Sequence, residues 1–253
     1  MGNIYQMIVF IFLGHSNMAG SCAEMDTIPH ERVWSYNARR GYYHCTDRDI
    51  SNNSGSPMMP FLKAMANQYP KYDFCGIKLA GPCRHASHVL EEGRHREALE
   101  NEIAWFKGKA VFGGAMLNFG ILECRDGVAS KSFGENLITL IEFLREKTEV
   151  PGLPILLCRL EKNGPERMPE YQRHEGLIES TIGGIQYRVS GLAVIPFIDI
   201  PAKYYCDPEA DVQKPHDYHH YSKEGYEILG RDGTKAIQLN NFDFWNNPTA
   251  SGQ

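Results

Sequence analysis

The sequence predicts an α/β protein, a three-layer α/β/α sandwich with a central parallel sheet. Met7–Leu13 is a run of seven apolar residues without alternation, which is typical of a strand buried on both faces. Further apolar runs alternate along the chain with segments of helical periodicity, and this alternation indicates a parallel sheet covered by helices on both sides. The 253 residues, 42% hydrophobic and 23% charged, suffice for one globular core.

The strands after Met7–Leu13 are expected where short apolar or β-prone runs are bounded by turn residues. They are Glu31–Asn37, Phe74–Ala80, Lys109–Leu117, Pro154–Leu160 and Leu192–Ile200. Helices are expected where apolar residues recur every three or four positions, as at Leu99, Ile103 and Phe106. They are Pro60–Gln68, Arg96–Lys107, Phe133–Arg145, a helix between Pro169 and Arg188, and Ser222–Leu239.

The organisation along the chain indicates one domain over residues 1–240, followed by a tail or linker over residues 241–253 that is rich in Asn, Ser and Gly. No internal repeat or domain-sized change of composition divides it. Arg39–Pro60 is rich in Asn, Ser, Gly and Asp and is predicted to be a long loop. Long loops in compact domains are often functional, so we expect this one to border the substrate site.

The net charge and the apolar pattern of the chain restrict the classes of partner that it can bind. With 26 basic and 31 acidic residues the formal net charge is −5, which argues against a nucleic-acid or anionic-membrane partner. No apolar run approaches the roughly 20 residues of a membrane span, and Met7–Leu13 lacks the flanks of a signal sequence. The location stays open between a secreted or periplasmic one, if a leader has been removed, and otherwise a cytoplasmic one, and the oligomeric state also stays open.

Cysteine spacing predicts no zinc site, because the seven cysteines form no Cys-x-x-Cys pair. Cys75 and Cys158 lie in strand-like runs and are expected to be core thiols. Four of the others lie in predicted loops and could pair in an oxidising compartment: Cys22, Cys45, Cys83 and Cys206.

Ser16 is the first candidate for chemistry. It follows the predicted first strand, and ligands of open parallel sheets bind beyond the carboxyl ends of the strands. A serine there can act as a nucleophile if a base takes its proton and donors hold the oxyanion. The alternative is that Ser16 or Asn17 caps the following helix.

Two segments carry a family resemblance. Gly14–Gly20, Gly-His-Ser-Asn-Met-Ala-Gly, resembles the first block of the SGNH hydrolase superfamily, in the branch of carbohydrate esterases and sialate O-acetylesterase-like proteins. That branch usually has Gln at the position of His15. Asp217 and His220 match the Asp-x-x-His of the last block, and Gly225-Tyr226 matches its continuation. The resemblance spans most of the chain and implies a flavodoxin-like SGNH hydrolase fold.

The resemblance implies a Ser16–His220–Asp217 triad, and the chemistry explains the spacing. His220 would take the proton of Ser16 through one ring nitrogen while the Asp217 carboxylate orients the other. His219, one residue away, is the rival base. A metal site is the alternative for this loop, with ligands from His216, Asp217, His219 and His220.

The resemblance also implies an oxyanion hole made by the Ser16 N–H, the Gly81 N–H and the Asn118 amide. Gly81 follows the second core strand but lacks the family's usual Gly-Gly-Thr or Gly-Gly-Ser, and Asn118 stands where the branch more often shows His-Gln-Gly-Glu-Ser. Each has a structural alternative, because Gly81 can simply end a strand and Asn118 can close a turn.

Several nearby residues are not expected to be catalytic. Glu123 and Arg125 are interpreted as a structural pair, and Trp34 either as a sugar platform or as a core residue. Arg84, His85 and His88 are interpreted as a solvated basic loop that could contact substrate.

The function implied by the resemblance is hydrolysis of an O-acetyl or other small acyl ester on carbohydrate, such as acetylated xylan. Ser16 would be the nucleophile and no cofactor would be required. A catalytically degenerate carbohydrate-binding protein of the same fold is the alternative, favoured by His15 and by the altered sequence after Gly81.

Overall fold

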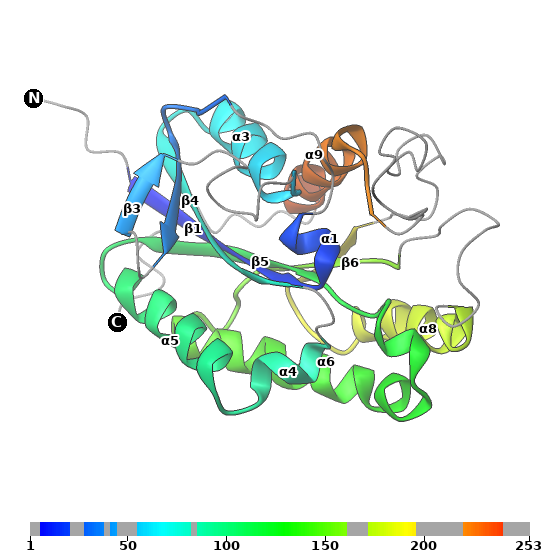
Figure 1. Cartoon of the computed structure of the whole chain (residues 1–253). Coiled ribbons are helices and arrows are strands. Elements are labelled where there is room, and N and C mark those ends of the chain that lie inside the picture. Colours follow the sequence, from blue (N-terminus) through cyan, green and yellow to red (C-terminus); the bar gives the residue numbers. More distant parts are fainter. Residues whose placement is uncertain are drawn as a thin grey trace, which may run out of the picture.

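The computed structural model describes residues 6–20, 28–37, 41–44, 55–81, 85–160, 172–195 and 220–239. They form a seven-stranded sheet in the order β3-β2-β4-β1-β5-β6-β7 (Figure 1). All neighbouring strands pair in parallel except β3, which is antiparallel to β2. The strands are β1 (Gln6–Gly14), β2 (Val33–Asn37), β3 (Gly41–His44), β4 (Tyr72–Ala80), β5 (Val111–Asn118), β6 (Ile155–Cys158) and β7 (Leu192–Ile195).

Helices cover both faces of this sheet, so the predicted three-layer α/β/α fold is confirmed (Figure 1). On one face lie α3 (Met58–Gln68) and α9 (Lys223–Leu239). On the other face lie α4 (Ala86–Leu90), α5 (Arg94–Phe106), α6 (Gly127–Thr148) and α8 (Glu175–Ile185). None of the helices in the described ranges is both long and apolar enough to cross a membrane.

β1 is the centre of the fold, between β4 and β5. Its side chains enter both hydrophobic layers: Val9, Ile11 and Leu13 pack towards α5 and α6, whereas Ile8, Phe10 and Phe12 pack towards α3 and α9. All six are at most 1% exposed. The lack of alternation in this run is therefore explained by burial on both faces, as expected.

Three segments differ from the sequence prediction, and one of them is α4, a short helix at the place of the predicted basic loop with His85 and His88. β3 and the start of α3 fall inside the predicted loop Arg39–Pro60, and residues 45–54 of that loop lie outside the described ranges. Helix α6 begins at Gly127, before the predicted Phe133, because the Asp126 carboxylate caps it. That carboxylate accepts hydrogen bonds from the N–H groups of Val128 and Ala129, at 2.6 and 3.3 Å, and these bonds lower the pKa of Asp126.

The packing also decides how Trp34 and the cysteines Cys75 and Cys158 are interpreted. Trp34 lies in β2 opposite Cys75 and packs against the core. Cys75 is five residues before the end of β4, about 16 Å from the edge where Ser16 lies, at 3.3 Å per residue. Trp34 is thus a half-buried residue packed against the core and not a sugar platform beside Ser16. Cys75 and Cys158 are buried, as expected.

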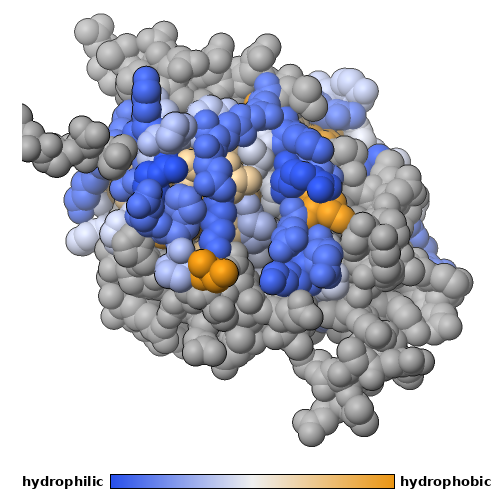
Figure 2. Space-filling model, turned by 90° about the horizontal axis from the view of Figure 1, so that it is seen from above, coloured by the Kyte–Doolittle hydropathy of each residue, from blue (hydrophilic) through white to orange (hydrophobic). Residues whose placement is uncertain are grey.

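Helices α3 and α9 pack closely together, and their outer surface is mostly hydrophilic (Figure 2). Gly230 of α9 makes this approach possible. A Cβ atom at Gly230 would lie 2.6 Å from the backbone nitrogen of Phe61 and 2.8 Å from the carbonyl carbon of Pro60. These are backbone atoms, so no side-chain rotation relieves the contact.

We therefore expect Gly230→Ala to lower the free energy of unfolding by about 2–4 kcal/mol, because it forces two packed helices apart. Gly184→Ala in α8 is the matched control, since a Cβ there meets no atom within 4 Å. It should raise stability by about 0.5–1 kcal/mol through helix propensity alone. Urea unfolding of both variants measures the difference, and equal midpoints would contradict the close-packing argument.

Candidate active site

The turn after β1 carries Ser16. The chain leaves the sheet at Gly14, and α1 (Ser16–Ala19) begins at Ser16. His15 is the N-cap of this short helix, and its Nδ1 accepts a hydrogen bond from the Asn17 N–H at 3.3 Å. The capping role considered for Ser16 or Asn17 thus belongs to His15, which leaves the Ser16 hydroxyl available for another contact.

That contact is with His220, which lies just before α9. The Ser16 Oγ is 2.7 Å from His220 Nε2, across 204 residues of sequence. A neutral imidazole whose Nε2 carries no proton accepts the serine proton along such a hydrogen bond. The two motifs at opposite ends of the chain therefore meet at the carboxyl edge of the sheet, at the geometry that proton transfer from a serine requires.

The remaining members of the histidine-rich loop, His216, Asp217 and His219, lie outside the described residues. The third member of the triad, the rival base and the alternative metal site therefore stay predictions. Arg84 also lies outside the described ranges. His85 is the N-cap of α4 and His88 lies within this helix, not in a loop as predicted; the Nδ1 of His88 accepts a hydrogen bond from the His85 N–H at 3.2 Å.

Strand register brings the two predicted oxyanion residues to the same edge as Ser16. Gly14 is paired with Ala80 of β4 on one side and with Asn118 of β5 on the other. The Asn118 carbonyl accepts a hydrogen bond from the His15 N–H at 3.2 Å. The Asn118 side chain is buried, and it forms no hydrogen bond to another side chain or backbone group in the described ranges. Its amide N–H can therefore donate to a substrate.

Gly81 is differently engaged. Its N–H donates to the carbonyl of Gly14 at 3.3 Å, which continues the ladder between β4 and β1. This distance is at the long end for an N–H···O bond. Gly81 can serve as an oxyanion donor only by exchanging this bond for one to the substrate.

Glu123 joins the loops that follow β4 and β5. Its carboxylate is buried, and it accepts hydrogen bonds from the N–H groups of Ala86 and Gly120, both at 2.9 Å. Ala86 begins α4, and Gly120 follows Asn118 by two residues. Glu123 therefore has a structural role, as expected, but it holds these two loops together through their N–H groups and, among the described residues, does not pair with Arg125 as predicted.

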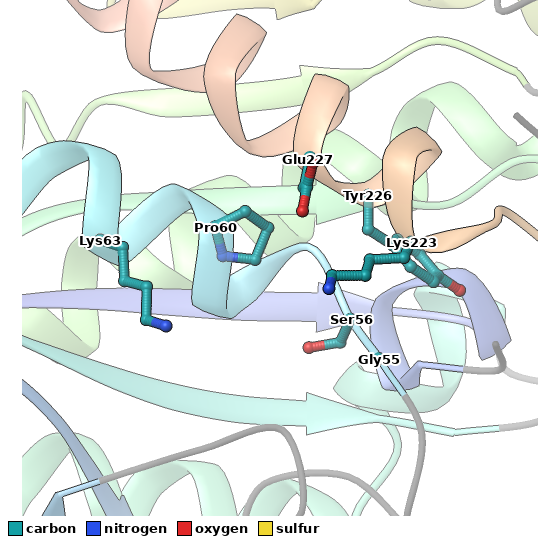
Figure 3. Close-up of a pocket in the computed structure, with 7 residues that line it drawn as sticks. All are labelled: Gly55, Ser56, Pro60, Lys63, Lys223, Tyr226 and Glu227. Atoms are coloured by element: carbon teal, nitrogen blue, oxygen red, sulfur yellow. The ribbon is translucent and has the colours of Figure 1, made fainter. Parts of the chain in front are cut away.

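A pocket of about 180 Å³ lies between the first turns of α3 and α9 (Figure 3). Lys63, Lys223 and Glu227 provide its charged groups, and Tyr226 forms part of its wall. The Tyr226 side chain extends from α9 towards α1, where its hydroxyl donates to Asn17 Oδ1 at 3.1 Å (Figure 3). Tyr226 thus separates this pocket from the turn that carries Ser16.

The family model for carbohydrate esterases described as sialic acid-specific acetylesterases matches residues 6–237. The chain belongs to this family. Membership of this carbohydrate esterase family indicates that the chain is an ester hydrolase. The hydrogen-bond contact between a serine and a histidine at the carboxyl edge of the sheet agrees with this activity. It also agrees with the resemblance found at both ends of the sequence.

Solved structures share the fold of this carbohydrate esterase. A protein from Arabidopsis thaliana has a TM-score of 0.72 at 18% identity, with 93% of this chain and 98% of that chain covered. NanS has a TM-score of 0.68 at 10% identity, with 96% of this chain and 98% of the NanS chain covered. A carbohydrate acetylesterase from Xanthomonas citri has a TM-score of 0.58 at 13% identity, covering 93% and 57%. No curated protein matches the sequence significantly.

Sequence reasoning missed how the two halves of the esterase site are joined. The sequence suggests Asn17 only as a helix cap and Tyr226 only as part of a motif, yet the two are in direct hydrogen-bond contact. The signal was present, since the Gly225-Tyr226 pair follows His220 at a fixed spacing in the block that the sequence resembles. Only the structure shows why Tyr226 stands at this spacing, because its hydroxyl donates to Asn17.

Proposed function

We propose that this carbohydrate esterase is a serine esterase that removes O-acetyl groups from carbohydrate through a Ser16–His220–Asp217 triad. The observation that carries the proposal is the 2.7 Å contact between Ser16 Oγ and His220 Nε2. Asp217 enters by its position three residues before His220, where a turn can bring its carboxylate to the other ring nitrogen.

In the proposed reaction His220 takes the hydroxyl proton while Ser16 Oγ attacks the acetyl carbonyl carbon. The oxyanion of the tetrahedral intermediate accepts hydrogen bonds from the Ser16 N–H and the Asn118 side-chain amide, and from the Gly81 N–H if that group leaves Gly14. The intermediate collapses as His220 gives the proton to the departing sugar oxygen. Water, deprotonated by His220, then attacks the acetyl carbon, and His220 returns this proton to Ser16 Oγ as the bond between Oγ and the acetyl carbon breaks and acetate leaves.

The substrate class is proposed from two sources. The family description names sialic acid, and one solved structure of the same fold is described as a carbohydrate acetylesterase. The candidates are therefore O-acetylated sialic acid, acetylxylan and related plant cell-wall or glycan sugars.

The test is acetate release from O-acetylated sialic acid and from acetylated xylan, measured with an enzyme-coupled acetate assay. We expect release from at least one of them by the wild type. The Ser16→Ala protein at equal concentration is the control for spontaneous hydrolysis. Release that continues unchanged with Ser16→Ala would overturn the serine mechanism.

The alternative is a carbohydrate-binding protein of the same fold without turnover. The observation in its favour is the Gly81 N–H, which is bonded to Gly14 and is not open to a substrate oxygen. Calorimetric titration with the deacetylated sugars separates the two functions. Binding without acetate release from any acetylated form would favour the binding protein.

A further inference from the structure

A single side-chain oxygen in the turn after β1 receives two hydrogen bonds from the segment that carries His220. Asn17 Oδ1 accepts from the backbone N–H of Tyr221 at 3.2 Å and from the hydroxyl of Tyr226 at 3.1 Å. An amide carbonyl oxygen has two lone pairs, so it can accept both bonds at once. The donors lie 204 and 209 residues after Asn17 in the sequence.

These contacts are adjacent to the two reacting side chains. Asn17 directly follows Ser16, and Tyr221 directly follows His220. A displacement of Tyr221 relative to Asn17 is therefore transmitted through one peptide unit on each side to the 2.7 Å contact between Ser16 Oγ and His220 Nε2. The Asn17 contacts thus set the distance over which the proton moves.

The network lies in a water-excluded environment. Asn17 is 1% exposed and both tyrosines are 2% exposed, with their rings packed edge to face at 5.7 Å and 83°. Hydrogen bonds are stronger there, and removal of the acceptor takes one hydrogen bond from each of the two buried donors. The backbone of Asn17 is also held, because its N–H donates to His15 Nδ1.

The tyrosine hydroxyl comes from a well-anchored helix. Tyr226 lies in the first turn of α9, which packs tightly on α3 through Gly230. Its side chain points from α9 towards α1 (Figure 3). The hydrogen bond between Tyr226 and Asn17 therefore holds the turn that carries Ser16 against the closely packed helices α3 and α9, and not only against the segment that precedes α9.

We propose that Asn17 is a positioning residue that holds His220 against Ser16 through Tyr221 and Tyr226. This inference rests on the proposed esterase function. Asn17 does not touch the substrate in this role; its neutral carbonyl oxygen aligns the base with the nucleophile. Because His220 acts as base in acylation and in deacylation, misalignment lowers kcat without raising KM.

The experiment compares three variants in the hydrolysis of p-nitrophenyl acetate, at a temperature where circular dichroism shows each to be folded. Asn17→Leu keeps the approximate shape and removes the acceptor, and kcat should fall about 10- to 100-fold with KM within about threefold. Tyr226→Phe removes one donor, and kcat should fall about 3- to 10-fold. Tyr36→Phe, a buried tyrosine of β2 in the opposite hydrophobic layer, is the matched control and should stay within twofold of wild type.

The double variant Asn17→Leu/Tyr226→Phe should be no slower than Asn17→Leu alone, because both changes remove the same hydrogen bond. Multiplicative losses in the double variant, or a folded Asn17→Leu protein with wild-type kcat, would overturn the positioning role. A purely structural residue would lower the unfolding midpoint and leave kcat of the folded protein unchanged.

A crystal structure of Asn17→Leu separates this inference from the proposed function. The distance between Ser16 Oγ and His220 Nε2 should lengthen beyond hydrogen-bond range, whatever the activity. A wild type without esterase activity together with this lengthening would contradict the proposed function and support the positioning role. An unchanged distance of 2.7 Å would overturn the positioning role even in an active enzyme.

Discussion

Replacement of Ser16 or His220 by alanine is expected to lower kcat/KM for p-nitrophenyl acetate at least about 1,000-fold, the largest effect of any single change in this chain. The physical reason is their 2.7 Å contact, since the serine oxygen becomes an effective nucleophile only as the imidazole takes its proton. The double variant should lose no more than either single variant, because the two residues act as one unit.

Ser132→Ala is the matched control for Ser16→Ala. Ser132 also lies in the first turns of a helix, α6, but its hydroxyl donates to the helix carbonyls of Val128 and Ala129. This variant should retain wild-type kcat/KM. Ser16→Ala with undiminished activity and unchanged folding would show that another group is the nucleophile. Asp217→Asn in the same assay should lose activity if the carboxylate orients His220.

The architecture followed from the sequence because its signals are local and strong. Met7–Leu13 is apolar at every position, and the structure buries it on both sides of the sheet. Alternating strands and helices then restrict the connections to a parallel sheet with crossovers. The edge strand β3 was missed because Gly41–His44 is a short segment within a polar stretch, and its pairing with β2 is decided by tertiary contacts.

The site followed from the sequence only in part. Motif spacing identified Ser16 and His220, and the structure brings them together. Asn118 could be placed beside them because parallel strands end at one edge of a sheet, which the register of β1 and β5 bears out. The bond between the Gly81 N–H and Gly14, and the carboxylate of Glu123 between two loops, depend on backbone positions that no sequence pattern encodes.

The geometry of the site therefore depends on how the strands pack as well as on the residues of the two motifs. The oxygen of Asn118 that accepts from the His15 N–H is a backbone atom, so β5 directly holds the turn that carries Ser16. The Asn118 side chain that is proposed to donate to the oxyanion leaves from the same residue. Ser16 and Asn118 are therefore fixed relative to each other by the closeness of β1 and β5 at Gly14.

Gly14→Ala is expected to break this arrangement, with the second-largest effect. A Cβ atom at this position would lie 2.4 Å from the Asn118 carbonyl oxygen and 2.8 Å from Met18 Cβ. Neither atom can rotate away, so either the end of β5 or the turn into α1 must move. We expect a loss of about 2–4 kcal/mol in the free energy of unfolding.

The same change should lower kcat/KM for p-nitrophenyl acetate about 10- to 100-fold in the protein that remains folded, because a displacement near 1 Å separates Ser16 from Asn118, the proposed oxyanion donor. Gly152→Ala is the matched control, since a Cβ there meets nothing within 4 Å, and it should change stability by no more than about 0.5 kcal/mol. Urea unfolding and steady-state kinetics measure both quantities. If Gly14→Ala loses stability but keeps its activity, strand closeness holds the fold and the position of Ser16 depends on α9 and Asn17 instead.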